Sequence, residues 1–168
     1  TRKPEDRRYA TLPNLRRVVD VAIDDDAPIR QALRRRTLPP ARMRRAWTTA
    51  GEAYRGVMRN EFGGFPQLYR AVREQLTARD LFQSVQHWKL VEHYYRTLTP
   101  IEPFIDFYWT WRFTHLLLYR LMRLDLPAAD IYHPIASGYA GFTGVCGKLQ
   151  HGRRLVLTEH GQYTRERE

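Results

Sequence analysis

The chain has 168 residues, of which 43% are hydrophobic, so it is long enough to form one domain with a buried core. No apolar run approaches the roughly 18 residues that a transmembrane helix needs, and no signal-peptide pattern is present. The single cysteine, Cys146, excludes an internal disulfide and is typical of a reducing cytoplasm. We expect it to pack in the core.

The net charge of +10 is concentrated in the N-terminal part of the chain. Residues 1–60 contain 15 Lys and Arg against 7 Asp and Glu. A basic segment of this kind can bind anionic lipid headgroups, a phosphate-bearing substrate or nucleic acid. No zinc-ligand spacing, RNP string or helix-turn-helix pattern accompanies it, so specific nucleic-acid binding is not expected.

The first 40 residues predict a strand and a short helix. Residues 15–23 alternate weakly in hydropathy, which indicates a strand, and the aspartates at 24–26 end it in a turn. Consecutive side chains in a turn point apart, so a solvated turn or a helix start is favoured over a metal site. A basic helix is predicted over 29–36, closed by the prolines at 39 and 40.

Residues 41–98 are predicted to form a mainly helical insertion. Apolar residues at three- and four-residue spacing indicate a helix from residue 41. The run Phe62-Gly-Gly-Phe-Pro66 interrupts it, and a helix over 67–76 follows. Asp80 is expected to cap a further helix over 81–98.

The longest helical pattern spans residues 104–124. Its wide apolar stripe, rich in aromatic residues, predicts a largely buried helix that lies along the sheet. The aromatic residues could also stack on carbohydrate, but a core helix is the simpler interpretation. His115 lies within the stripe and is expected to be a packed histidine.

The chain is organised around residues 129–167. Apolar runs predict buried strands over 129–133 and 154–158, with a helix over 138–150 between them. The side chain of Ser137 is expected to cap this helix, and Gly152 to end it. The result is a βαβ unit, and in open α/β sheets ligands bind at the C-terminal edges of the strands.

Two features that follow the first strand could bind a substrate. The helix start at Ser137, Gly138 and Tyr139 offers N–H groups and a positive dipole to an anion such as a phosphate. Its glycine could instead serve only close packing of helix on strand. His133 lies at the end of the strand, where it either faces a cleft or is a satisfied structural residue.

Two more features follow the second strand. Glu159 and His160 lie at its end, where an imidazole can donate a hydrogen bond to a sugar hydroxyl or a backbone carbonyl. Glu159 either holds the His160 tautomer or satisfies nearby backbone. Tyr163, Arg165 and Glu166 come next, and Arg165 either binds a phosphate or an acidic acceptor or belongs to a solvated tail.

Long strings in this region carry a family resemblance. His133-x3-Ser-Gly-Tyr-Ala-Gly141 and Leu157-Thr-Glu-His-Gly-x-Tyr-Thr-Arg-Glu-Arg167 are similar to the N-terminal domain of PelF-like glycosyltransferases, of the retaining GT4 class with the GT-B fold. The run Phe104-Ile-Asp-Phe-Tyr-Trp-Thr-Trp-Arg112 resembles the same family, and the match is best over 85–168. Pro134 and Gln162 depart from its pattern.

The resemblance implies an α/β fold, a partial Rossmann-like domain of the GT-B N-terminal type with a mainly helical insertion. Residues 1–168 would be one such domain, with 41–98 as the insertion and 104–168 as a helix plus the βαβ core. The chain begins at Thr1 rather than Met, which indicates a fragment or a processed chain. Most nucleotide-sugar contacts, including an E-x7-E pair, would come from a C-terminal Rossmann-like domain.

The implied activity is transfer of a hexose from a UDP-sugar, with retention, to a growing exopolysaccharide. His160 and Glu159 would be catalytic, and His133, Ser137 and the other candidates would bind substrate. The UDP-sugar is the donor substrate, and neither a cofactor nor a metal is expected. This acceptor-side piece is expected to be inactive alone.

The implied partners are the nucleotide sugar, a glycan acceptor, the C-terminal domain and a membrane-associated polysaccharide synthase complex, with no specific nucleic acid. The basic first 60 residues would dock on the synthase or on anionic lipid, at the cytoplasmic side of the inner membrane. The alternative is a non-enzymatic scaffold domain, whose basic face recruits an anionic partner.

Overall fold

The computed structural model describes residues 13, 18–19, 27–34, 37–98 and 101–160. The turn at 24–26 and most of the strand predicted over 15–23 lie outside these residues. The described elements follow in chain order: α1 (Ala27–Leu33), α2 (Pro40–Met58), the 3-10 helix η2 (Phe62–Gly64), α3 (Phe65–Arg70), the π-helix η3 (Ala71–Gln75), α4 (Ala78–Phe82), α5 (Val85–Leu98), α6 (Phe104–Met122), β1 (Ile131–Tyr132), α7 (Gly138–His151) and β2 (Arg154–Leu155).

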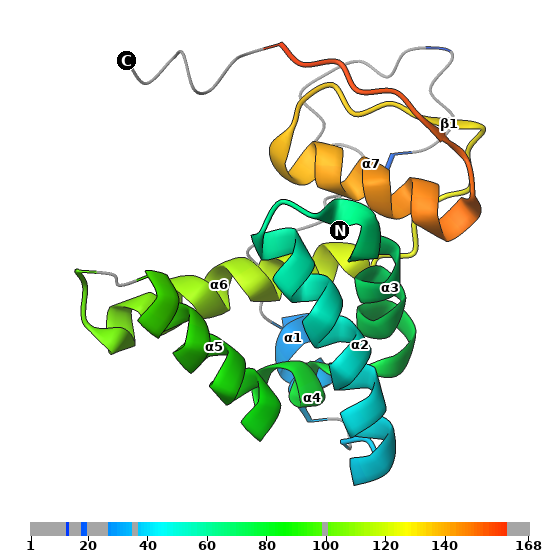
Figure 1. Ribbon diagram of the computed structural model, residues 1–168. Coiled ribbons are helices and arrows are strands. Elements are labelled where there is room, and N and C mark those ends of the chain that lie inside the picture. The colour runs from blue at the N-terminus through cyan, green and yellow to red at the C-terminus, as the bar shows by residue number, and fades with distance from the viewer. Residues whose placement is uncertain (1–12, 14–17, 20–26, 35–36, 99–100, 161–168) are drawn as a thin grey trace.

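The described chain is mainly helical, and β1, α7 and β2 form a small layer at one end of it (Figure 1). The two strands are parallel, with Ile131 opposite Arg154 and Tyr132 opposite Leu155. Two further backbone hydrogen bonds continue the pairing, from Val156 N–H to the Tyr132 carbonyl and from Thr158 N–H to the Pro134 carbonyl. A βαβ unit is therefore present as predicted, within a chain that has far more helix than sheet. Its strands are shorter than the predicted 129–133 and 154–158, and the prediction that they are buried is wrong, because Ile131, Val156 and Leu157 are each about half exposed.

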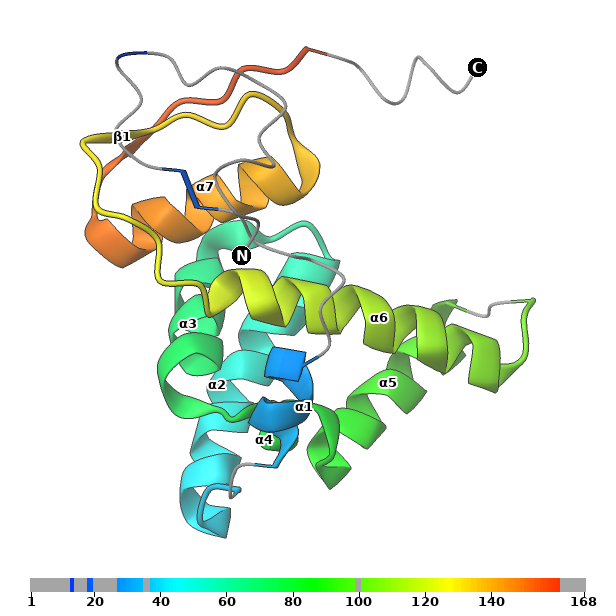
Figure 2. The ribbon, with the colours of Figure 1, turned by 180° about the vertical axis from the view of Figure 1, so that it is seen from behind.

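The helix α7 lies between the two strands and the helical body (Figures 1 and 2). Gly152 ends it in the left-handed conformation, as predicted, with its N–H donating to the Lys148 carbonyl at 2.8 Å. Cys146, on the same helix, is 1% exposed, and burial raises the pKa of its thiol to about 12. The cysteine is a packing residue, as the sequence predicts.

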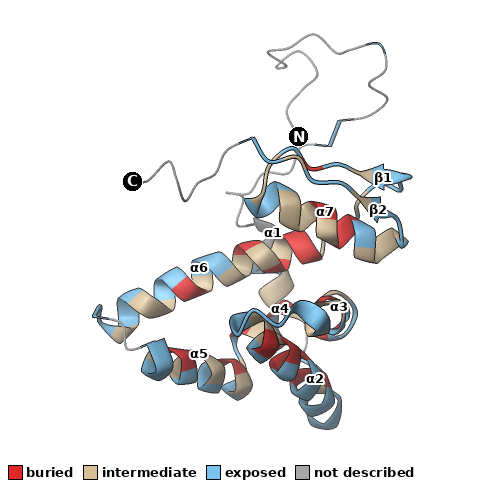
Figure 3. Cartoon of the chain, turned by 45° about the horizontal axis from the view of Figure 1, so that its top comes forward, coloured by how far each residue is buried: buried red, intermediate tan, exposed pale blue. Residues whose placement is uncertain are grey.

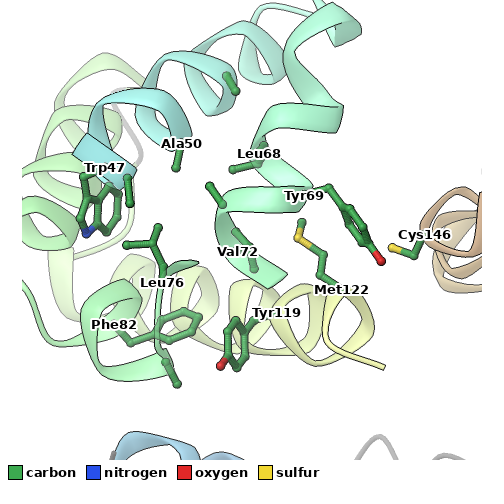
Figure 4. Close-up of a cluster of buried hydrophobic side chains, with 14 residues drawn as sticks. Trp47, Ala50, Leu68, Tyr69, Val72, Leu76, Phe82, Tyr119, Met122 and Cys146 are labelled. Carbon is green, nitrogen blue, oxygen red and sulfur yellow. The ribbon is translucent and has the colours of Figure 1, made fainter. Parts of the chain in front are cut away.

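The main core forms where α2, α3, η3, α4, α6 and α7 meet (Figure 4). Trp47 and Ala50 of α2 face Leu76 and Phe82 across it, in agreement with the predicted apolar spacing of α2. The core also contains the buried residues Ala46, Ala53, Leu68, Tyr69, Ala71, Val72, Ala78, Tyr119, Met122 and Cys146.

The helix predicted over 81–98 is two helices, and the prediction that Asp80 caps it is wrong. Thr77 caps α4: its Oγ1 accepts from Asp80 N–H at 3.1 Å, and Asp80 Oδ2 accepts from Thr77 N–H at 2.9 Å. This is a capping box, in which Asp80 is the third helical residue. Its Oδ1 accepts from Leu38 N–H at 3.1 Å, so the buried carboxylate also holds the segment before α2.

The helix α6 packs against α5, η3 and α7. The prediction that this helix lies along the sheet is wrong. The helix α7 lies against the strands instead, between them and α6 (Figure 2). His115 is packed as predicted: its Nε2 shares a hydrogen bond of 2.7 Å with Tyr54 Oη, and its Nδ1 is 2.7 Å from the Trp111 carbonyl oxygen. Burial lowers the pKa of His115, so the neutral ring is favoured.

Candidate functional site

Closely packed glycines on α7 position the two strands. A Cβ atom at Gly144 would lie 2.4 Å from Pro134 Cγ, and one at Gly147 would lie 2.6 Å from Tyr132 Cε1. Because both distances are far below van der Waals contact, only glycine lets the helix lie this close to β1 and the residues after it. The close packing holds the ends of both strands at one edge.

At that edge the structure brings together His133 and Thr158. The His133 Nε2 and Thr158 Oγ1 atoms are 2.7 Å apart and share a hydrogen bond, whose direction depends on the imidazole tautomer. Thr158 is fixed by its own backbone, since its N–H donates to the Pro134 carbonyl at 3.0 Å. Sequence reasoning missed Thr158, although the parallel strands it predicted end beside each other at residues 133 and 158.

The start of α7 is tied to the end of the second strand. Ser137 N–H donates to Glu159 Oε2 at 2.8 Å. The Ser137 side chain makes no capping hydrogen bond, so the prediction that it caps the helix is wrong. The Glu159 carboxylate places a negative charge at the positive end of the helix dipole. The sequence left two roles open for Glu159, namely holding the His160 tautomer or accepting a hydrogen bond from nearby backbone. This hydrogen bond is the second of them.

Gly138 and Tyr139 lie on the solvent side of the edge. Gly138 has φ of 65°, and a Cβ atom there would meet no other atom within 4 Å. Its backbone conformation, rather than close approach by another group, is what requires glycine. The Tyr139 ring is half exposed, so it can contact a ligand from the edge.

His160 is exposed at the end of the described residues and makes no hydrogen bond with another of them. Tyr163, Arg165 and Glu166 lie outside the described residues. The two strands at this edge are largely exposed (Figure 3). The edge carries the imidazoles of His133 and His160, the hydroxyl of Thr158 and the carboxylate of Glu159. These groups can donate to and accept from sugar hydroxyls, and an imidazole can stabilise charge that develops on an oxygen.

A search of the described residues finds no group of three or more His, Cys, Asp or Glu side chains arranged to hold a metal ion. None of the described helices is long and apolar enough to cross a membrane.

Comparison with known proteins places the chain by sequence. No curated protein and no solved structure matches it. One family model matches over residues 1–168, the full length given. The chain therefore belongs to the family described as Domain of unknown function (DUF3492).

Proposed function

We propose that this chain is the acceptor-side part of a retaining glycosyltransferase of the PelF-like GT4 class, with a GT-B, Rossmann-like architecture. It would take part in transfer of a hexose from a UDP-sugar to a growing exopolysaccharide. The observation that carries the proposal is the parallel βαβ unit, which gathers His133, Thr158 and Glu159 at the edge where α/β sheets bind ligands. The resemblance of the surrounding strings supplies the reaction class.

Each residue has a role in this proposal. The His160 imidazole donates to the donor sugar, where charge develops as the glycosidic bond forms. His133 and Thr158 hold each other in one orientation and present a hydrogen-bonding pair to the acceptor. Glu159 is a positioning residue, since its carboxylate fixes the strand end against the start of α7.

The proposal also assigns partners to the chain. A second, Rossmann-like domain would hold most of the nucleotide sugar, as the resemblance implies. The glycan acceptor would lie against the edge formed by the two strand ends. A membrane-associated synthase complex would bind the basic N-terminal part, which places the enzyme at the inner membrane's cytoplasmic surface.

The test is UDP release by the complete protein that carries this chain, measured with a panel of UDP-hexoses and oligosaccharide acceptors. We expect turnover with at least one donor, and NMR of the product should show the anomeric configuration of the donor. Neither binding nor turnover with any donor would favour the scaffold alternative. Turnover with inversion of the anomeric configuration would contradict the GT4 assignment but would still support glycosyl transfer.

A further inference from the structure

A basic groove runs between α2 and α5, away from the strand-end site. It has a volume of about 520 Å³, and its lining includes Arg44 and Arg55 of α2 with Lys89 and His93 of α5. None of the described residues that line it is acidic. Glu92, on the same helix as Lys89, is already paired with Arg96 at 2.6 Å. The groove therefore presents three permanent positive charges that its own walls do not neutralise.

An apolar cavity adjoins this groove. It has a volume of about 140 Å³, close to the size of an engineered cavity that binds benzene. Trp47 of α2 and Leu90 of α5 line both the groove and the cavity, so the two spaces share a wall. The rest of its lining includes the apolar residues Ala50, Val57 and Leu118, together with His87 and Trp111.

Polar atoms without partners occur at both spaces. Gln86, which lines the groove, has a buried Oε1 atom with no hydrogen-bond partner among the described residues. His87 and Trp111 line the cavity, and the His87 Nε2 and Trp111 Nε1 atoms are buried in the same unpartnered state. Buried groups of this kind are rare in folded proteins. A hydrocarbon chain can hydrogen-bond neither His87 Nε2 nor Trp111 Nε1, so these two atoms are not contacts of an apolar ligand in the cavity.

We propose that α2 and α5 form a binding site for an anionic amphiphile, with a phosphate or carboxylate head in the basic groove and a single hydrocarbon tail in the apolar cavity. Arg44, Arg55 and Lys89 bind the head through charge-assisted hydrogen bonds. Trp47 and Leu90 form the boundary between the two spaces, so entry of the tail requires this boundary to move, including the Trp47 ring whose Nε1 donates to the Asp80 carbonyl at 3.2 Å. This site is independent of the glycosyl-transfer proposal, because none of the strand-end residues lines it.

The first experiment titrates the protein with hexyl phosphate, methyl phosphate and 1-hexanol by calorimetry. Burial of several methylene groups should make hexyl phosphate bind on the order of 100-fold more tightly than methyl phosphate. Loss of the charged head should make 1-hexanol bind at least about tenfold more weakly than hexyl phosphate. Equal affinity of hexyl and methyl phosphate, equal affinity of hexyl phosphate and 1-hexanol, or no binding of hexyl phosphate would overturn the proposal.

Variants locate the site. The double substitution Arg44→Gln and Lys89→Gln should raise the Kd of hexyl phosphate about tenfold or more. The matched control, Arg70→Gln with Arg153→Gln, removes the same charge from exposed positions that line neither space and should leave the Kd within about twofold. An equal effect of both pairs would mean that general charge attraction explains binding, and the site assignment would fail.

Filling the cavity tests the tail. Ala50→Leu should abolish the advantage of hexyl over methyl phosphate, because the added side chain occupies the same space. Overpacking can disturb a core, so the comparison of ligands on the unaltered protein decides the question if this variant unfolds. Retention of the full hexyl advantage in a folded Ala50→Leu protein would refute the tail site.

Co-sedimentation then separates two sources of the same chemistry. The site would be assigned to a membrane lipid by two results together. The wild type should pellet with vesicles of phosphatidylcholine and phosphatidylglycerol but not with phosphatidylcholine alone, and the variant with both Arg44→Gln and Lys89→Gln should stay in the supernatant. Binding of hexyl phosphate without pelleting would assign it to a soluble amphiphile.

Discussion

Single residues at the strand ends join segments that are far apart in the sequence. The hydrogen bond between His133 and Thr158 spans 25 positions, and the one between Ser137 and Glu159 spans 22. Each fixes a polar group that would otherwise rotate freely on an exposed edge. Such fixed groups lose less conformational entropy when a ligand binds.

One prediction concerns the backbone at Gly138. Its φ of 65° is unfavourable for any residue with a Cβ atom, so Gly138→Ala should destabilise the fold by about 1–2 kcal/mol. Urea unfolding monitored by circular dichroism measures this change. Gly63→Ala is the control, because that glycine has no positive φ and its Cβ would also meet no other atom within 4 Å. Equal effects of the two substitutions would show that the left-handed conformation carries no cost.

A second prediction concerns pH. Burial, followed by the nearby His115 and Arg112, lowers the pKa of His87 from 6.5 to about 4. Between these two values the unfolded chain binds a proton at His87 and the folded protein does not. Stability that is present above pH 6.5 is therefore lost as the pH falls towards 4, by about 3 kcal/mol for this group.

The measurement is the free energy of unfolding at pH 7 and at pH 4. In His87→Gln the difference between the two should be about 3 kcal/mol smaller than in the wild type. His93→Gln, which changes an exposed histidine of the same helix, should keep the wild-type difference. A wild-type pH dependence in His87→Gln would refute the account of the buried imidazole.

At the scale of elements, α7 is the part that organises the site. It covers one face of the strands through its glycines and contacts α3 and α6 with other residues. The ends of the strands are thereby fixed relative to the helical body. On the other face, Ile131 and Val156 are about half exposed, so no described element packs closely over them.

A third prediction tests this packing. Gly147→Ala would put a Cβ atom 2.6 Å from the Tyr132 ring, so either the ring must shift or the helix and β1 must separate. The expected loss is about 1–3 kcal/mol, the usual range for overpacking. Thermal unfolding measures it, with Lys148→Ala at the neighbouring exposed position as the control. A Gly147→Ala protein as stable as this control would contradict the close packing.

The sequence predicted the elements better than it predicted their contacts. The apolar runs and Gly152 suffice for the βαβ unit, because strand and helix periodicity are local properties. The caps were wrong at Asp80 and Ser137 for one reason. Both residue types favour the N-cap position, but which residue makes the capping hydrogen bond depends on contacts in the folded chain. Thr77 caps α4, and at the start of α7 the Ser137 N–H donates to the distant Glu159.

At the candidate site too, the elements were predicted better than their contacts. The strand ends were predictable, because parallel strands finish at one edge. The partner of His133 was not, because the choice of Thr158 depends on strand register and on how closely α7 packs. The groove between α2 and α5 was also missed, since its cations belong to helices that are neighbours only in the folded chain.

At the scale of the whole molecule, a mainly helical body carries a sheet of only two described strands. Parallel sheets are usually covered on both faces, and here the face opposite α7 is exposed. In the proposed glycosyltransferase, further strands and a second domain would continue this layer and close the edge into a cleft. The strand-end residues would then face the nucleotide sugar. Substitution of His160, which is proposed to donate to the donor sugar, therefore tests the account most directly.

The most direct measurement is the kcat for UDP release by the complete protein, wild type beside His160→Ala. Loss of a hydrogen-bond donor to the transition state should lower kcat by roughly 10²-fold or more. The control Lys148→Ala, which changes an exposed residue in the last turn of α7, should keep the wild-type rate. A His160→Ala enzyme that releases UDP within about twofold of the wild-type rate would contradict the central claim that this strand end is the catalytic edge.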